Sequence, residues 1–166
     1  MNETYVECLV KRETNVAIRF LKYLLYALTA IIGIFSLLTN FLLGFIAAIA
    51  LGVGAYFLNL NTDIEYEYLY VDREISIDRI MARSKRKKVA TFDVEKIEIL
   101  APINSYHLDD YKNRQIKPTD YSSGVAKQPD RRFVFFYEGQ KKVILEPSPE
   151  FVKAVYNVAP RKVFTD

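Results

Sequence analysis

The chain has 166 residues, a net charge of +3 and a hydrophobic content of 51%, with one cysteine and no tryptophan. The single cysteine, Cys8, excludes an intrachain disulfide framework, and so small a net charge excludes a strong field directed at nucleic acid. One apolar run takes up about forty residues, and the remainder suffices for one compact domain with its own core.

A short arm, residues 1–19, precedes the apolar run. Apolar and charged residues mix over 4–12 in a spacing that fits either a short amphipathic helix lying on a membrane or a strand. We interpret Cys8 as a small apolar residue of this arm rather than as a lipidated or reactive thiol. A signal peptide is not expected, because the apolar run is too long and follows several acidic residues.

The strongest feature is a run without charged side chains over 23–62, with the polar pair Thr39 and Asn40 near its middle. A helix needs about twenty apolar residues to cross the hydrocarbon core of a bilayer, so the run predicts two crossings that fold back at this pair. The predicted transmembrane hairpin occupies 20–61, with helices at about 20–38 and 41–60.

Basic residues flank this run on both sides and are absent from its bend. By the positive-inside rule, both chain ends lie in the cytoplasm and the protein is a multi-pass protein of the cell membrane. The spans carry no charged residue, which favours an anchor over a channel or transporter. Small residues allow close packing, either within the hairpin or against another membrane protein or a second copy of the chain. The predicted helix-packing residues are Gly33, Gly44, Ala48 and Gly52.

Beyond the spans, residues 63–166 are predicted to form one cytoplasmic domain made mainly of strands. Tyr66, Tyr68 and Tyr70 recur with the period of two that a half-buried strand requires, and we interpret them as one face of a sheet. Further β-rich segments are separated by turn residues. The predicted strands are 64–71, 74–82, 89–94, 96–100, 132–137 and 141–145.

A long loop and a C-terminal helix complete the predicted domain. Residues 104–131 are polar and show no clear periodicity, which predicts a long loop or a segment with only short elements. Ser148 suits a helix N-cap and Pro149 suits the first helical position, and the apolar stripe after them ends before Pro160. The predicted fold class is α+β, with five to seven strands in a meander followed by one helix.

This order of elements, together with 64–100 (IEYEYLYVDREISIDRIMARSKRKKVATFDVEKIEIL) and 144–157 (ILEPSPEFVKAVYN), resembles the bacterial pleckstrin-homology-like (PH-like) domain. The chain is also similar to small two-span membrane proteins of Gram-positive bacteria. The resemblance implies a bent, mainly antiparallel barrel closed by the C-terminal helix. Phosphoinositide specificity is not expected, because the chain lacks the tryptophan and the basic first loop typical of eukaryotic relatives, and only Arg73 lies in that turn.

The segment 79–88 carries six positive charges and no acid. The linker between the second span and the first strand is short, so a strand that runs away from the bilayer and a second that returns bring this turn back to the headgroups. We expect contact with anionic lipid, with a solvated turn or a protected edge strand as the alternative, and no contact with nucleic acid. The candidate lipid contacts are Arg79, Arg83, Lys85, Arg86, Lys87 and Lys88.

The long loop is a second candidate surface, because tyrosines in a segment that orders on contact can anchor a protein partner. The alternative is a variable surface loop. Its candidate anchors are Tyr106, Tyr111 and Tyr121. His107 and its neighbouring carboxylates do not match an organised metal or catalytic site, and the chain has no nucleotide-binding loop, nucleophile elbow or HExxH sequence. We therefore expect no catalytic residue, metal or cofactor.

These features predict a non-enzymatic, membrane-anchored binding or adaptor module that acts at the cytoplasmic leaflet. Its tether supplies a high local concentration, which favours a membrane or cytoplasmic protein partner over a lipid ligand. Two alternatives stay open. One is a sensor of anionic lipid through 79–88, and the other is an accessory subunit whose spans pack against a larger membrane protein.

Overall fold

The computed structural model describes residues 5–166, which divide into two compact units. The first unit contains the described residues up to Glu13, Glu65–Ile80 and Arg86–Asp166. The second contains Thr14–Ile64 and Met81–Lys85. The chain therefore enters the second unit twice, once for a helical hairpin and once for a short turn.

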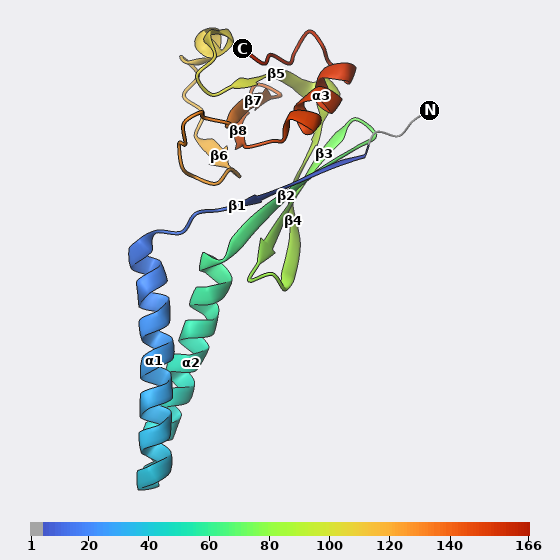
Figure 1. Ribbon diagram of the computed structural model, residues 1–166. Coiled ribbons are helices and arrows are strands. Elements are labelled where there is room, and N and C mark those ends of the chain that lie inside the picture. The colour runs from blue at the N-terminus through green and yellow to red at the C-terminus, as the bar shows by residue number, and fades with distance from the viewer. Residues whose placement is uncertain (1–4) are drawn as a thin grey trace. The chain divides into compact units, whose positions relative to one another are not determined.

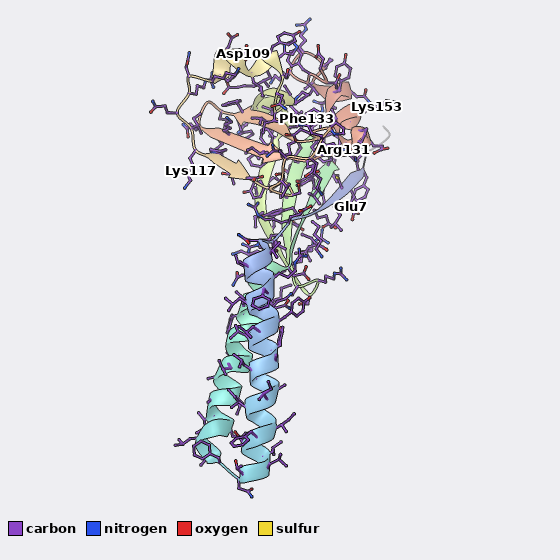
Figure 2. The ribbon with its side chains drawn as sticks, turned by 60° about the vertical axis from the view of Figure 1, so that its left-hand side comes forward. Glu7, Asp109, Lys117, Arg131, Phe133 and Lys153 are labelled. Atoms are coloured by element: carbon purple, nitrogen blue, oxygen red, sulfur yellow. The ribbon has the colours of Figure 1, made fainter. Side chains whose placement is uncertain are left out.

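Two antiparallel helices form most of the second unit (Figure 1). α1 spans Val16–Thr39 and α2 spans Leu42–Thr62. Both are long and apolar enough to cross a membrane. Few of their residues are buried, so most of these side chains point outward rather than into a protein core (Figure 2). The buried ones are Ser36 on α1 and Gly44, Ala48, Ala55 and Leu60 on α2.

The first helix begins at Val16, before the expected start at about residue 20. Its cap explains the difference, because the side chain of Asn15 accepts a hydrogen bond of 2.9 Å from the backbone N–H of Ala17. Arg19, the last residue of the predicted arm, therefore belongs to the first turn of α1.

The bend of the hairpin lies where the polar pair predicts it. Asn40 adopts the left-handed conformation with φ of 50°, and its N–H bonds to the carbonyl of Ser36. Asparagine tolerates this conformation better than most residues, so α1 ends here and α2 starts two residues later.

Two four-stranded sheets form most of the first unit. Sheet A has the order β1-β2-β3-β4, and its strands are Val6–Lys11, Ile64–Val71, Glu74–Met81 and Lys85–Asp93. β1 comes from the arm and pairs antiparallel with β2, with Val6 opposite Tyr70 and Lys11 opposite Glu65. The arm is thus a strand rather than an amphipathic helix, and the helical hairpin is inserted between two neighbouring strands of one sheet.

Sheet B has the order β5-β7-β8-β6, and its strands are Ile97–Pro102, Phe133–Tyr137, Lys141–Leu145 and Pro118–Asp120. The first three are antiparallel neighbours, whereas β6 is parallel to β8. A short 3-10 helix at Val94–Lys96 separates β4 from β5. The fold is α+β with mainly antiparallel sheets, as predicted, but the position of β6 departs from a simple meander.

The C-terminal helix α3, Pro149–Val158, starts where the sequence predicts it. The hydroxyl of Ser148 accepts a hydrogen bond of 3.2 Å from the N–H of Phe151. Phe151 is fully buried and meets the rings of Tyr68 and Tyr70 edge-on, with centroid separations of 6.1 and 6.2 Å. The predicted tyrosine face of β2 therefore lies in the core and packs against α3.

Aromatic rings also join the two sheets. Phe92 of β4 lies 4.9 Å from the ring of Phe135 and 5.2 Å from that of Tyr137, both on β7. Phe92 and Phe135 are almost completely buried. Edge-to-face contacts of this kind stabilise a core beyond the area that they bury.

Candidate functional site

The basic segment 79–88 forms a tight hairpin. β3 continues to Met81 and β4 begins at Lys85, four residues before the strand expected at 89–94. Ala82 and Arg83 have positive φ values of 48° and 53°, and Ser84 N–H donates to the carbonyl of Met81 at 3.1 Å. Two-residue hairpins prefer this left-handed turn because its twist matches that of the strands. Most of the positive charges therefore lie on strands.

The six basic residues of this segment have different surroundings. Arg79 is half-buried, whereas the side chains of the others are exposed at the turn or along β4. Exposure alone does not make a charge available, because a neighbouring carboxylate can balance it. Arg86 is the clearest case.

Arg86 binds two nearly buried acids. Its Nε donates to Asp78 Oδ2 at 2.6 Å, and its Nη2 forms an ion pair with Glu67 Oε2. Glu67 and Asp78 are 6% and 7% exposed, so the guanidinium compensates carboxylates that are largely removed from water. The bond to Asp78 raises the pKa of Arg86. The structure thus gives Arg86 a role inside the sheet.

This charged network continues to β1. The hydroxyl of Tyr5 donates to Glu7 Oε2 at 2.8 Å, and this bond lowers the pKa of the Glu7 carboxyl. Burial raises the pKa of Glu67, and its hydrogen bond with Glu7 acts in the same direction. Sequence reasoning missed the network. Its signal was the presence of acidic residues on the first three strands of the sheet, Glu7 on β1, Glu67 on β2 and Asp78 on β3, beside the basic strand β4.

Within the second unit, the β3–β4 turn contacts the end of α2. Ala82 N–H donates to the carbonyl of Asp63 at 2.7 Å. The ammonium of Lys85 lies 5.9 Å from the centroid of the Tyr56 ring, within the range of a cation–π contact. The basic turn is therefore attached to the helical hairpin.

A second lysine meets the same end of α2 from α1. Lys22 Nζ donates to Asn59 Oδ1 at 3.2 Å and lies 5.1 Å from the ring centroid of Tyr23. Thr14 immediately precedes Asn15, the N-cap of α1, and its hydroxyl donates to the carbonyl of Thr62. These contacts hold together the two ends of the hairpin.

The three candidate anchors of the long loop differ in exposure. Tyr106 is 64% exposed on the 3-10 helix Tyr106–Tyr111. Tyr111 packs 4.7 Å from the ring of Phe136, and Tyr121 packs 5.4 Å from the ring of Tyr66. Of the three, Tyr106 presents the most accessible ring, and the other two help to fold the segment onto the domain.

His107 lies in a small stack of rings. Its centroid is 4.0 Å from that of Tyr106 and 3.8 Å from that of Phe164, and its Nε2 lies 3.4 Å from Asp166 Oδ1. Asp109, on the same 3-10 helix, is exposed (Figure 2). Among residues 5–166, no group of three or more His, Cys, Asp or Glu side chains has the arrangement that holds a metal ion.

The second half of the long loop binds the segment that leads into α1. Arg12 Nη1 donates to the carbonyl of Asp120 at 2.9 Å, and Glu13 N–H donates to the carbonyl of Ser123 at the same distance. Lys127 Nζ lies 2.6 Å from Glu13 Oε1. The segment predicted as a long loop, or as one with only short elements, therefore holds the arm in place.

The predicted helix-packing residues line the contact between α1 and α2. A Cβ added to Gly44 would meet the side chains of Ser36 and Phe41, the latter at 2.9 Å. The corresponding atom of Gly33 would lie 3.9 Å from the Cβ of Ala48, whereas that of Gly54 would meet nothing within 4 Å. The small residues thus serve packing within the hairpin, and their pattern does not require a further membrane protein.

A family model described as Bacterial PH-like domain (DUF6106) matches residues 2–165, which include the hairpin as well as both sheets. No curated protein and no solved structure matches the chain.

Proposed function

The chain belongs to the bacterial PH-like domain family, and from this premise we propose that it is a non-enzymatic, membrane-anchored module that binds a protein partner at the cytoplasmic leaflet. Domains of this kind act by binding, and their location in the cell determines which partners they can bind. The tether holds the domain at the membrane surface, so a partner of moderate affinity is captured there without tight binding in solution.

The observation that carries this proposal is the insertion of an outward-facing apolar hairpin between β1 and β2. Exposed apolar surface on this scale needs either lipid or a protein partner to cover it. Both helices have the length for one crossing. Because β1 and β2 pair along six residues, the two ends of a hairpin that crosses a bilayer must emerge on the same side.

The charges support a cytoplasmic location for that side. Basic residues precede α1, occupy its first turns and recur throughout the sheets, whereas the bend at Thr39 and Asn40 has none. Lys and Arg are retained on the cytoplasmic side of short membrane proteins. The proposed topology has both chain ends and both sheets inside the cell.

The exposed ring of Tyr106 is the proposed centre of the protein contact. It lies on a 3-10 helix whose other end is fixed by the packing of Tyr111 on Phe136. An aromatic side chain on a rigid base loses little conformational entropy on binding, which is typical of interface residues with large energetic effects. Tyr156 on α3 is also exposed, at 45%, and provides a matched control.

The test is recovery of a partner from membranes of the native host. Affinity-tagged full-length protein, solubilised in mild detergent, is expected to retain one protein in stoichiometric amount by quantitative mass spectrometry. Tyr106→Ala is expected to lower that recovery about tenfold or more, since such a residue contributes about 2 kcal/mol, and Tyr156→Ala is expected to leave it unchanged. Absence of a stoichiometric partner contradicts the proposal.

Replacing residues 14–63 by an unrelated two-helix anchor separates the adaptor from the accessory subunit. The adaptor keeps its partner with the foreign anchor, because the contacts come from the sheets and loop. Loss of the partner in the exchanged chain, with the domain still folded, favours the subunit.

A sensor of anionic lipid is the second candidate function. The contacts of Ala82 with Asp63 and of Lys85 with Tyr56 favour it, because they attach part of the basic segment to the end of a proposed span. Each basic residue near an anionic leaflet contributes about 1 kcal/mol. Vesicle binding that depends on anionic lipid in the absence of any protein partner distinguishes this function.

A further inference from the structure

Two lysines that lie 63 positions apart in the chain meet neighbouring residues of α2. Lys22 Nζ donates to Asn59 Oδ1 at 3.2 Å, and Lys85 Nζ lies 5.9 Å from the ring centroid of Tyr56. All four residues belong to the second unit. Their placement therefore does not depend on how the two units are arranged.

The helix geometry brings the two ammonium groups to one face. Tyr56 and Asn59 are three residues apart on α2, so their side chains are neighbours with Cβ atoms about 5–6 Å apart. Each ammonium has three donors, and the bond from Lys22 to Asn59 uses one of them. Donors from both lysines are thus directed toward the same short stretch of helix.

We propose that Lys22 and Lys85 form a binding site for the phosphate group of an anionic phospholipid, with Tyr56 and Asn59 beneath it. This inference rests on the proposed membrane anchoring and identifies the ligand class and its site. The phosphate accepts hydrogen bonds from both ammonium groups, and such charge-assisted bonds are stronger than neutral ones. The tyrosine ring suits the headgroup level, where one end of an aromatic side chain is apolar and the other polar.

The surface below the lysines identifies a lipid as the occupant. Val53 and Phe57 of α2, next to Tyr56, are 51% and 57% exposed. An acyl chain that extends from the bound phosphate covers this apolar surface, whereas a soluble anion leaves it bare. The ligand therefore combines one negative headgroup with hydrocarbon tails.

Of the basic residues in segment 79–88, only Lys85 belongs to the proposed site. Arg86 already binds Glu67 and Asp78, and its charge is balanced within sheet A. Lys87 and Lys88 lie on β4 and are exposed. They provide a control pair with the same charge and no contribution to the proposed site.

The experiment uses the full chain in detergent micelles, with bound phosphatidylglycerol and phosphatidylcholine measured by native mass spectrometry. Phosphatidylglycerol is expected to bind more tightly than phosphatidylcholine. Lys22→Gln and Lys85→Gln are each expected to weaken phosphatidylglycerol binding about fivefold, and the double variant about 25-fold. The matched pair Lys87→Gln/Lys88→Gln is expected to change it less than about twofold.

The site is wrong if the unsubstituted chain binds the two lipids equally or if the double variant binds phosphatidylglycerol as tightly as the unsubstituted chain. It is also wrong if the control pair loses as much phosphatidylglycerol binding as the double variant. Excess inorganic phosphate is expected to leave the lipid bound, and its displacement by phosphate contradicts a lipid site. Circular dichroism of each variant verifies that the fold is intact.

Failure of the site is distinguishable from failure of the anchoring on which it rests. The unsubstituted chain and the double variant are both expected to stay with membranes after alkaline carbonate extraction. If both stay and lipid binding is unchanged in the variant, only the site is wrong. Release of the unsubstituted chain by carbonate contradicts the anchoring and the site with it.

Discussion

Arg86 illustrates how a residue's surroundings decide the role of its charge. Its guanidinium binds Glu67 and Asp78 on neighbouring strands, both nearly buried. Removing the guanidinium lowers the free energy of unfolding by more than the ion pairs themselves contribute, because the remaining carboxylates stay poorly solvated and uncompensated. Arg86 is therefore expected to support the stability of sheet A.

Arg86→Met is expected to lower the midpoint of thermal unfolding, and to lower it more at about pH 8 than at about pH 5. Burial raises the pKa of Glu67 above the ordinary value of a glutamate carboxyl, so the folded state binds this proton more tightly than the unfolded state and stability falls as the pH rises through the raised pKa. Arg86 lowers the pKa of Glu67, so removing Arg86 raises this pKa further and enlarges the loss of stability at high pH. The deficit shrinks again as Glu67 takes up its proton at low pH.

Lys87→Met provides the control for this prediction. It removes one positive charge from the same strand at an exposed position. A deficit of equal size in both variants, or one that does not vary with pH, contradicts the role assigned to Arg86. Thermal unfolding of the full chain in detergent, monitored by circular dichroism at both pH values, measures the deficits of the two variants.

Tyr68 connects three segments through one buried hydroxyl. It donates to the carbonyl of Tyr121 at 2.6 Å and accepts from the N–H of Glu146 at 3.3 Å. Burial raises the pKa of Tyr68, so the group stays neutral and keeps its proton for the donated bond. Tyr68→Phe is expected to reduce the free energy of unfolding by about 1–3 kcal/mol, because two partly buried backbone groups lose their partner.

Denaturant unfolding of the full chain in detergent checks this value. Tyr156→Phe removes an exposed hydroxyl from α3 and is expected to have almost no effect. The prediction for Tyr68 is wrong if its variant unfolds like the control.

At the scale of elements, the small residues of the hairpin let α1 and α2 approach closely. Gly44 faces Ser36, Gly33 faces Ala48, and the added atoms would be in contact or overlap. In lipid, helices associate through such packing, because apolar side chains gain nothing by leaving hydrocarbon for each other. The hairpin is thus expected to form a fixed pair.

A cysteine pair tests this contact directly. In a Cys8→Ser background, Gly33→Cys with Ala48→Cys is expected to form a disulfide readily, since the relevant Cβ atoms are 3.9 Å apart and disulfides have about 3.8 Å. After cleavage at a protease site inserted at the bend, the two halves remain joined until reduced. Gly33→Cys with Gly54→Cys is the control, because a Cβ at Gly54 would meet nothing within 4 Å, and equal cross-linking in both pairs contradicts the packing.

The long loop shows how an element without periodicity becomes ordered. Its 3-10 helix packs through Tyr111, β6 pairs in parallel with β8, and its second half binds Arg12 and Glu13 of the arm. No local sequence pattern predicts these contacts, because each partner lies in a distant segment of the chain. The sequence therefore predicts the loop's polarity and length but not its order.

At the scale of the whole molecule, the hairpin is an insertion into a sheet. β1 pairs with β2 although the entire hairpin separates them in the chain. A chain that starts at residue 63 lacks β1 and leaves β2 as an open edge, which favours aggregation. The complete PH-like domain of this protein therefore includes the arm.

Joining the arm directly to β2 is expected to give a water-soluble domain. Replacing residues 14–63 by a turn of about four Gly and Ser residues retains the register of β1 with β2 and removes the apolar surface. The product is expected to be folded and monomeric by circular dichroism and size-exclusion chromatography. Residues 63–166 alone are expected to aggregate or unfold, and equal behaviour of the two chains contradicts the role of β1.

The sequence by itself determined the features that depend on neighbouring residues. The long apolar run with its polar break specifies the hairpin and its bend, and the period of two over 64–71 specifies β2 with the bounds that the structure has. Ser148 and Pro149 specify the start of α3. Each signal is local, because hydration, backbone conformation and capping act within a few residues.

Only the tertiary structure decided which distant segments meet. In sequence the arm fits a helix or a strand equally well, and its pairing with β2 makes it a strand. The basic residues of 79–88 look alike in sequence, but in the structure Arg86 binds two acids and Lys85 contacts Tyr56. The physical reason is that a charge or a strand edge acquires its role from its partner. That partner is brought close by the fold of the whole chain and has no fixed spacing along it.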